Sequence, residues 1–320
     1  MKIRSIPYIN PNNDFIDLYL SELRSQDIET VNFKWWKINS LKQRNIVFHL
    51  HWPEAVYRDD YFLLSLFKAI RFVLFFYLHK FNKNKWIFFL HNVIPHEDTG
   101  YIKNKINLFI FRILLKGSDR VIGLSKNTIS EAQNRYKISI ENKYTFIEHF
   151  LYPINKIASN SELSLYLNQN INFDYILTFH SDKRKKGTEI LIQEFPKEND
   201  CKLIIIGSEI KLHNNNIIQI KNFPKTEIFN SLVKNSIGVI LNYDRITTSG
   251  MFFHCLSLNK VSVVPNLNFF FQTSSKNTSI FYDAPLTEKK IIKIIKDLKQ
   301  YKFKIDRPFN SVSDFTKKIK

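Results

Sequence analysis

The stretch TTSGMFFHCLSLNKVSVVP, residues 247–265, decides how this chain folds. An apolar strand ends just before it, a polar turn follows, a helix opens at Ser249 and Gly250, and residues 261–264 form the next strand. The first N–H groups of a helix have no acceptor within it, and the helix dipole adds positive potential. The turn therefore indicates either a seat for an anion such as a diphosphate or an ordinary helix cap, which is the commoner case.

The same alternation of strand and helix runs along the rest of the chain. Short strands of β-branched and aromatic residues are predicted at 2–8, 31–35, 45–50, 86–90, 119–124, 144–147, 175–179, 202–206, 217–220, 237–242 and 261–264. Helices are predicted at 15–25, 61–81, 105–116, 125–136, 188–195, 227–234 and 287–301. This alternation favours the α/β class, with parallel sheets covered by helices on both faces.

A stretch rich in Ser, Asn and Gln, residues 159–172, is the predicted join between two Rossmann-like halves. We therefore expect an N-terminal domain at 1–158, a C-terminal domain at 173–302 and a polar, basic tail at 303–320. The sequence leaves open whether this tail returns to the N-terminal domain. The length is sufficient for two domains that each bury a core.

The composition limits the class of protein. The chain carries 47 Lys and Arg against 29 Asp and Glu, a formal net charge of +18. Such a charge suits nucleic acid, an anionic membrane surface or a phosphate-bearing substrate, although a general bias towards Lys, Asn and Ile explains it as well. The two cysteines cannot build a disulfide framework or a zinc site, and no signal-type apolar run follows the N-terminus. We expect a cytoplasmic protein.

One segment, residues 61–81, is rich in Leu, Phe and Ile and raises the question of a membrane. Lys68, Arg71 and His79 interrupt it, which disfavours a transmembrane helix. It fits an amphipathic helix that packs on a sheet, and its basic and aromatic residues also suit a membrane interface. The two interpretations are compatible if only one face of the helix is buried.

A basic turn in the second half, Lys183 to Gly187, lies between a strand and a helix, as the Ser249–Gly250 turn does. In a doubly wound sheet both turns would lie at the carboxyl edge, where ligands bind. Two anion seats at one edge are more informative than either alone, although a solvated basic loop explains the first equally well. The sequence contains neither G-x-x-x-x-G-K-[ST] nor G-x-G-x-x-G, which disfavours a P-loop ATPase and a standard dinucleotide dehydrogenase.

Polar clusters also follow the predicted strands of the first half. His51–Trp52–Pro53–Glu54 follows one strand, and His91–Asn92–Val93–Ile94–Pro95–His96–Glu97 follows another. Single histidines are usually structural, but repeated histidines at one edge of a sheet suggest a site.

These features together resemble the GT-B-fold glycosyltransferases of bacterial surface polysaccharides, such as exopolysaccharide and capsule. The resemblance rests on the two Rossmann-like halves, Lys186–Gly187, Gly207, the stretch from Thr248 to Pro265, and above all the His-Asn-x-x-Pro-His-Glu string. It covers most of the chain from Asn45 to Pro265.

The resemblance implies two Rossmann-like domains facing each other across a cleft, and an enzyme that transfers a hexose from a nucleotide-diphosphate sugar. The acceptor would be a glycan or a saccharide linked to polyprenyl diphosphate, at the inner face of an anionic membrane. No metal or other cofactor is expected. The implied donor-binding residues are His180, Arg184, Lys186, Gly187, Asn222, Phe223, Tyr243, Thr248, Ser249 and Gly250. The implied acceptor-binding residues are His51, Trp52 and Glu54, and the candidate bases are His96, Glu97 and His91.

The sequence departs from the family in two places. Many retaining members carry two Glu eight positions apart around the donor turn, whereas Ile246 and His254 stand at that spacing here. Their absence favours inversion of the anomeric carbon. His180 stands where a Gly is common, and it could touch the diphosphate or cap its turn.

Two other classes of function stay open. The basic surface could bind nucleic acid, which would need aromatic and basic residues interleaved on one exposed platform. Alternatively, the chain could bind a nucleotide sugar without turning it over.

Overall fold

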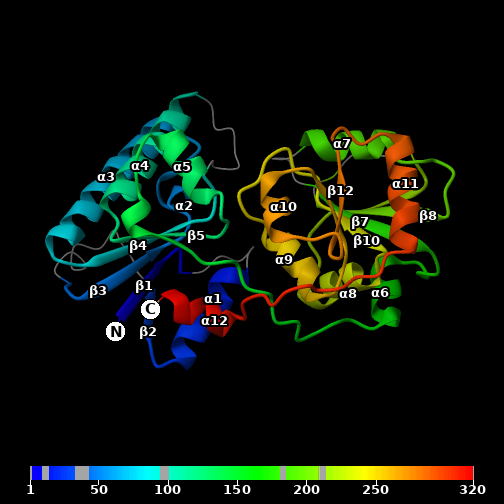
Figure 1. Ribbon diagram of the computed structural model, residues 1–320, viewed down its shortest axis with the longest axis horizontal. Coiled ribbons are helices and arrows are strands. Elements are labelled where there is room, and N and C mark those ends of the chain that lie inside the picture. Colours follow the sequence, from blue (N-terminus) through cyan, green and yellow to red (C-terminus); the bar gives the residue numbers. More distant parts are fainter. Residues whose placement is uncertain are drawn as a thin grey trace. The chain divides into compact units, whose positions relative to one another are not determined.

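The computed structural model describes residues 2–8, 14–32, 43–93, 101–180, 185–207, 209 and 214–319, with the backbone alone described at 101, 102, 185 and 186. The chain divides into two compact units, of which unit 1 comprises Met1–Phe150 with Asn310–Lys320 and unit 2 comprises Leu151–Phe309. Each is an α/β unit with its own sheet and core (Figure 1).

Unit 1 contains a six-stranded sheet in the order β2-β1-β3-β4-β5-β6, and all of its pairings are parallel. Its strands are β1 (Lys2–Ile6), β2 (Glu29–Asn32), β3 (Ile46–Leu50), β4 (Lys85–Leu90), β5 (Arg120–Gly123) and β6 (Tyr144–Phe146). Its helices are α1 (Asp14–Ser25), α2 (Glu54–Tyr57), α3 (Phe62–Phe81), α4 (Tyr101–Gly117), α5 (Thr128–Tyr136), the 3₁₀ turn Glu141–Lys143 and α12 (Val312–Ile319).

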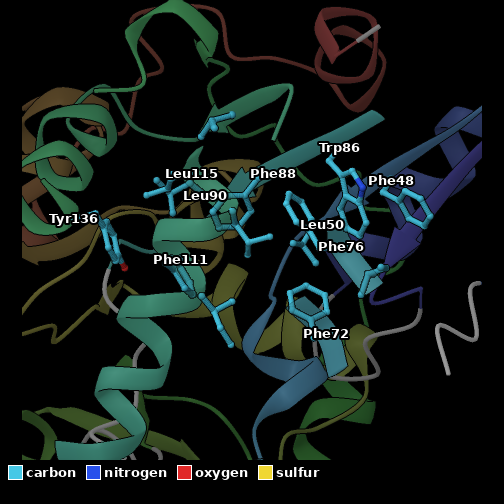
Figure 2. Packing of buried hydrophobic residues seen from close by; sticks show 14 of the residues in the cluster. Phe48, Leu50, Phe72, Phe76, Trp86, Phe88, Leu90, Phe111, Leu115 and Tyr136 are labelled. Carbon is cyan, nitrogen blue, oxygen red and sulfur yellow. The ribbon is translucent and has the colours of Figure 1, made fainter. Parts of the chain in front are cut away.

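Alternate residues of the central strands point to opposite faces of this sheet. Phe48, Trp86 and Phe88 join the core under α3, α4 and α5. Figure 2 shows this layer, with Phe72 and Phe76 of α3 and Phe111 of α4 packed near the aromatic residues of the strands. His49 and Phe89 lie on the other face, where they contact Tyr19 of α1.

Helix α12, from the C-terminal end of the chain, lies beside α1 in unit 1 (Figure 1). Its Phe315 ring packs against Phe15, Tyr19 and Phe150. Gln26 donates a hydrogen bond to Thr316, and the Arg120 guanidinium donates to the carbonyls of residues 318 and 319. The expected polar tail thus ends in an amphipathic helix that completes the layer over α1.

Unit 2 contains a second six-stranded parallel sheet, in the order β12-β11-β10-β7-β8-β9. Its strands are β7 (Asp174–His180), β8 (Cys201–Gly207), β9 (Ile217–Ile220), β10 (Gly238–Ile240), β11 (Ser262–Pro265) and β12 (Ser279–Tyr282). Its helices are α6 (Asn160–Leu167), α7 (Lys185–Glu194), α8 (Thr226–Asn235), α9 (Gly250–Ser257), α10 (Asn268–Thr273) and α11 (Glu288–Lys299). Helices α6, α8, α9 and α10 cover one face, and α7 and α11 cover the other.

The division between the units falls at 150/151 rather than at the expected 158, and the expected linker belongs to unit 2. Residues 151–158 are held there because Asn230 and Ser231 of α8 donate to the carbonyls of Lys156 and Ala158. Residues 159–172 contain α6, which a capping box of Ser159 and Glu162 begins. Two further elements of unit 2, α10 and β12, are not predicted from the sequence.

Candidate functional site

The predicted polar residues of unit 2 lie where its strands end. His180 is the last residue of β7, and it stands in register with Gly207, the last residue of β8. Gly207 has a φ of +135°, and a Cβ atom there would lie 1.8 Å from the carbonyl oxygen of His180. Only glycine fits this approach, because side chains rarely adopt such a backbone and the neighbouring atom is main chain.

A second close approach joins the start of α7 to the end of β10. A Cβ atom on Gly187 would lie 2.8 Å from Nδ2 of Asn242, two residues beyond β10. The Asn242 amide is held in place because its Oδ1 accepts a hydrogen bond from Tyr282, 2.8 Å away. The missing side chain at Gly187 therefore allows Asn242 to lie against the first turn of α7.

The next residue, Tyr243, connects this point to the start of α9. Its hydroxyl lies 3.0 Å from the Ser249 hydroxyl, and Ser249 Oγ accepts the backbone N–H of Phe252 as the N-cap. The structure thus shows that Ser249 caps the helix, which is one of the two functions that the sequence allows for this turn. Capping leaves the N–H groups of Gly250 and Met251 without an acceptor inside the helix, so the helix start still offers donors to an anion.

Tyr152, which no sequence pattern indicates as a site residue, lies over this helix start. Its hydroxyl oxygen would be 2.9 Å from a Cβ atom on Gly250, so any larger residue at 250 would displace it. The Tyr152 backbone N–H is anchored on Ser257 Oγ at 2.8 Å. Two residues before Gly250, Thr248 Oγ1 is buried without a hydrogen-bond partner among the described residues.

Asn222 and Phe223, which are predicted to bind the donor, follow β9 and are exposed. The Phe223 ring is 59% exposed, and it stacks on Phe179 of β7 with a centroid separation of 6.1 Å. Phe229 supports it from α8 at 5.7 Å. An exposed ring held by two others at a sheet edge is a suitable stacking platform for a planar group.

In unit 1 the structure brings three predicted residues together. His51 follows β3 and His91 follows β4, and His51 Nδ1 lies 3.0 Å from His91 Nε2. Trp52 stacks on His91 with a centroid separation of 4.3 Å. Phe15 of α1 packs against all three rings and also against His149. His51, Trp52 and His91 thus form one aromatic cluster at the carboxyl edge of the sheet.

Burial keeps these imidazoles neutral. It lowers the pKa of His51 and of His91 well below the ordinary value, and the neighbouring imidazoles lower both further. Burial also lowers the pKa of His149 to about 4. Because a general base works best with a pKa near the working pH, His91 is a weak base in this environment.

The remaining predicted residues of unit 1 divide into two groups. Glu54 begins α2 and is half-buried. His96 and Glu97 lie outside the described residues. Near the cluster, His51 Nε2 and Asn92 Oδ1 are buried without a hydrogen-bond partner in the described part of the chain. The choice among the three candidate bases therefore stays a prediction.

In unit 2, Arg184 lies outside the described residues, and Lys186 is described in its helical backbone alone. At the positions of the two family carboxylates, Ile246 is half-buried, and His254 Nε2 bonds to Asn230 Oδ1 at 2.8 Å. No group of three or more His, Cys, Asp or Glu side chains is placed to hold a metal ion among the described residues. The expectation that the reaction needs no metal stays a prediction.

No family profile and no curated protein sequence matches this chain. Solved structures do. HepE of Anabaena, in complex with UDP and glucose, matches with a TM-score of 0.64 and 11% identity over 100% of this chain and 94% of its own. WaaG, a glycosyltransferase involved in lipopolysaccharide biosynthesis, matches with a TM-score of 0.62 and 9% identity, over 93% of this chain and 90% of its own.

Sucrose-phosphate synthase of Thermosynechococcus elongatus matches with a TM-score of 0.56 and 12% identity, over 97% of this chain and 75% of its own. The chain has the GT-B fold. The α/β class and the two Rossmann-like sheets expected from the sequence are thereby confirmed. At these identities the GT-B likeness shows the fold alone.

Proposed function

We propose that this chain is a glycosyltransferase that binds a nucleotide-diphosphate sugar on unit 2 and transfers the sugar to a saccharide acceptor. The observation that carries the proposal is the connection between two helix starts at one sheet edge. Gly187 of α7 contacts Asn242, and the adjacent Tyr243 bonds to the N-cap of α9. The GT-B likeness to HepE, whose structure contains UDP and glucose, supports the same assignment.

The two helix starts would supply the main chemical effect. In the transfer, the acceptor hydroxyl oxygen bonds to the anomeric carbon of the donor sugar. The bond from that carbon to the diphosphate oxygen breaks, and the nucleoside diphosphate leaves with the electron pair. Backbone N–H groups fixed at both helix starts would stabilise the charge that develops on this leaving group. Arg184 and Lys186 would add cations to the same seat.

The nucleobase would stack on Phe223. This ring is exposed, is supported by Phe179 and Phe229, and stands beside Asn222, whose amide can both donate and accept hydrogen bonds. His180 would lie nearest the diphosphate at the end of β7. Tyr152 and Thr248 would complete the wall of the donor site beside Gly250.

The acceptor would bind at the carboxyl edge of unit 1, beside Trp52, His51 and Glu54. Its hydroxyl proton would pass to His96 or Glu97. We assign His91 to holding the Trp52 ring rather than to taking the proton, because burial lowers its pKa and its Nε2 already contacts His51. The stacked indole suits the apolar face of a sugar ring.

We further propose that the sugar is a hexose and that the acceptor is a glycan or a polyprenyl-diphosphate-linked saccharide of a bacterial surface polysaccharide. The anomeric carbon would be inverted without a metal ion. Inversion is favoured because neither Ile246 nor His254 provides a carboxylate beside the donor turn. His254 is neutral as well, since burial lowers its pKa to about 4.

A thermal-shift screen in the presence of EDTA tests the proposal. UDP-, GDP- and dTDP-sugars are compared with CMP-sugars, which carry a single phosphate. We expect one nucleotide-diphosphate sugar to raise the Tm by several degrees. A ligand at a concentration of 100 times its Kd adds about 2.7 kcal/mol to the free energy of unfolding. A Phe223→Ala variant should lose much of this shift. If no nucleotide sugar moves the Tm of the wild-type protein, the proposal fails.

A release assay then separates an enzyme from a binding subunit. The selected donor is incubated with saccharide and lipid-linked acceptors, and the freed nucleoside diphosphate is measured. Release that needs an acceptor is the expected result. Donor binding without release for any acceptor would support a binding subunit without catalysis. A mobility shift of nucleic acid at physiological salt would support a nucleic-acid-binding protein.

A further inference from the structure

Helix α3 carries more exposed large apolar side chains than any other element in the described part of the chain. Leu63, Phe67, Leu74 and Phe81 are 76%, 62%, 59% and 86% exposed. The other exposed apolar side chains on or directly before this helix are Tyr61, Phe62, Leu64, Leu66, Ile70, Tyr77 and Leu78. Soluble proteins rarely leave a continuous apolar patch of this extent without a partner.

These residues form one stripe along the helix. Positions 63, 67, 70, 74, 77 and 81 follow each other at spacings of three and four, so they share one face. At 1.5 Å per residue the stripe runs for roughly 28 Å. It is as long as a bilayer core is thick, and by length and composition α3 could cross one.

The opposite face of α3 argues against such a crossing, because it is part of the core of unit 1. Phe76 packs on Trp86 at 4.8 Å, and Phe75 packs on Phe48 at 5.9 Å. Figure 2 shows Phe72 and Phe76 pointing toward the strands. His79 Nδ1 also lies 2.8 Å from Asn84 Nδ2. A helix held in this way can lie on a bilayer, but it cannot enter one without dissolving the core.

Exposed cations border the stripe. Arg71 lies on the flank of α3, and α4, which packs beside α3, exposes Lys105, Arg112 and Lys116. These three alternate at helical spacing with Phe109, which is itself exposed. Lys68 of α3 forms an ion pair with Asp59 at 2.6 Å. The patch is therefore apolar in the middle and basic along the α4 side.

We propose that this face of α3 and α4 is a docking surface for an anionic lipid bilayer, with α3 lying in the plane of the membrane. The apolar stripe would enter the boundary between headgroups and acyl chains, and the cations of α4 would contact lipid phosphates. Tyr61 and Tyr77 suit this depth, because their hydroxyls stay among the headgroups.

Charge complementarity selects a bilayer over a protein partner. An interfacial helix typically combines large apolar side chains with flanking Lys and Arg, as this surface does, and a chain of net charge +18 is attracted to anionic lipid. Helix α4 packs beside α3, and its exposed cations, like the apolar stripe of α3, face away from the core, so a flat charged surface can touch both at once. A second copy of the chain would present the same cations against them.

The docking has a consequence for the acceptor. Helix α3 begins at the carboxyl edge of the unit 1 sheet, where Lys103 of α4 donates to the carbonyls of Asp59 and Asp60 just before it. The same edge carries Trp52 and His91. A lipid-linked acceptor would thus reach this edge from the bilayer along the start of α3. The docking itself does not depend on the proposed transfer reaction, whereas this consequence does.

Vesicle cosedimentation tests the docking directly. The full-length protein is mixed with vesicles of phosphatidylcholine alone, or of phosphatidylcholine with phosphatidylglycerol. We expect binding to the anionic vesicles and a loss of at least ~10-fold for the variant Leu63→Ser/Phe67→Ser/Leu74→Ser, since each residue contributes buried apolar area. Leu165→Ser, at a position in α6 that is 78% exposed, is the matched control and should bind as the wild type does.

A second pair of variants tests the charges. Arg112→Gln/Lys116→Gln should lower binding to the anionic vesicles towards the level seen with phosphatidylcholine. Lys293→Gln/Lys296→Gln, which removes two exposed cations from α11, should leave binding largely unchanged. Circular dichroism and Trp fluorescence establish that each variant is folded, and nucleotide binding to unit 2 should be retained.

Three outcomes would overturn the proposal. The apolar triple variant could sediment with vesicles as fully as the wild type. Bound protein could resist extraction at alkaline pH, which would indicate a helix that spans the bilayer. Finally, the wild type could ignore vesicles and sediment as a dimer that the triple variant converts to a monomer, which would assign the face to a second copy.

Discussion

The hydroxyl of Tyr243 lies 3.0 Å from the hydroxyl of Ser249, and this contact ties the segment after β10 to the first turn of α9. The same Ser249 oxygen accepts the Phe252 N–H, 3.1 Å away. Tyr243 follows Asn242, which lies against Gly187 at the start of α7. A single pair of consecutive residues therefore contacts both helix starts that the donor site needs.

Removing the Ser249 hydroxyl should weaken both the helix and the donor site. Ser249→Ala leaves the Phe252 N–H without its cap, which should lower the free energy of unfolding by about 1 kcal/mol. It also frees the start of α9 to fray, so we expect at least ~10-fold weaker nucleotide binding. Tyr243→Phe keeps the cap and should have the smaller effect on stability. Urea unfolding and calorimetric titration measure the two quantities.

Gly207 should tolerate no side chain. In Gly207→Ala the new Cβ would stand 1.8 Å from the His180 carbonyl at a φ of +135°, so we expect unit 2 to lose at least ~3 kcal/mol of stability. Gly238→Ala is the matched control, because its Cβ would meet movable atoms of Leu298 and its backbone is ordinary. It should cost about 1–3 kcal/mol. Equal melting temperatures for the two variants would contradict the close approach at Gly207.

Unit 1 should lose stability as the pH falls below about 6.5, the ordinary pKa of histidine. Burial lowers the pKa of His149 to about 4 and that of His49 to about 3, and it lowers those of His51 and His91 as well. Because the unfolded chain binds protons that the folded chain excludes, stability is complete above the unfolded pKa and falls towards acid. For each such histidine, the free energy of unfolding falls by about 1.4 kcal/mol for each pH unit between its unfolded and its folded pKa.

Tryptophan fluorescence reports this loss selectively, since every Trp of the chain, at 35, 36, 52 and 86, belongs to unit 1. Urea unfolding at pH 8, 6 and 5 should show a falling midpoint. His149→Gln should reduce the slope of the unfolding free energy against pH by the equivalent of about one proton. A midpoint that does not change between pH 8 and 5 would contradict the neutral, buried state of these imidazoles.

The C-terminal helix should be required by unit 1. Phe315 is fully buried and packs on Phe15, Tyr19 and Phe150, so Phe315→Ala should destabilise unit 1 by about 3–5 kcal/mol. Lys317→Ala, an exposed change in the same helix, is the control and should stay within about 0.5 kcal/mol of the wild type. If both variants unfold at the same urea concentration by Trp fluorescence, α12 is not a structural part of unit 1.

Much of the fold could be predicted, because the central strands are short apolar runs between strong helix patterns. The stretch from Ser249 to Pro265 became α9 and β11, as its cap, turn and apolar run indicate. Two elements gave weaker signals. Strand β12 follows a polar run, and α12 shows only Phe315 and Ile319 as large buried apolar residues, so its amphipathic pattern is short. Their place depends on tertiary contacts that no local pattern specifies.

The candidate site was predictable where it follows strand ends. His180, Phe223 and Tyr243 lie at the expected edge because parallel strands bring their carboxyl ends together. Asn242 also lies near a strand end, two residues beyond β10, but its role emerges only from its contact with Gly187. Tyr152 had no signal at all. It reaches Gly250 through a hydrogen bond to Ser257 that links residues far apart in the sequence.

In the proposed donor site, the starts of α7 and α9 together bind the diphosphate of a nucleotide sugar. The chain has only seven glycines, so ¹⁵N-glycine labelling gives a simple amide spectrum that includes Gly187 and Gly250. Adding UDP, or the nucleoside diphosphate that the screen selects, should shift the amide signals of both residues and leave Gly117 and Gly123 of unit 1 unchanged. Saturable nucleotide binding that leaves the Gly187 and Gly250 signals in place would show that the two helix starts do not hold the diphosphate.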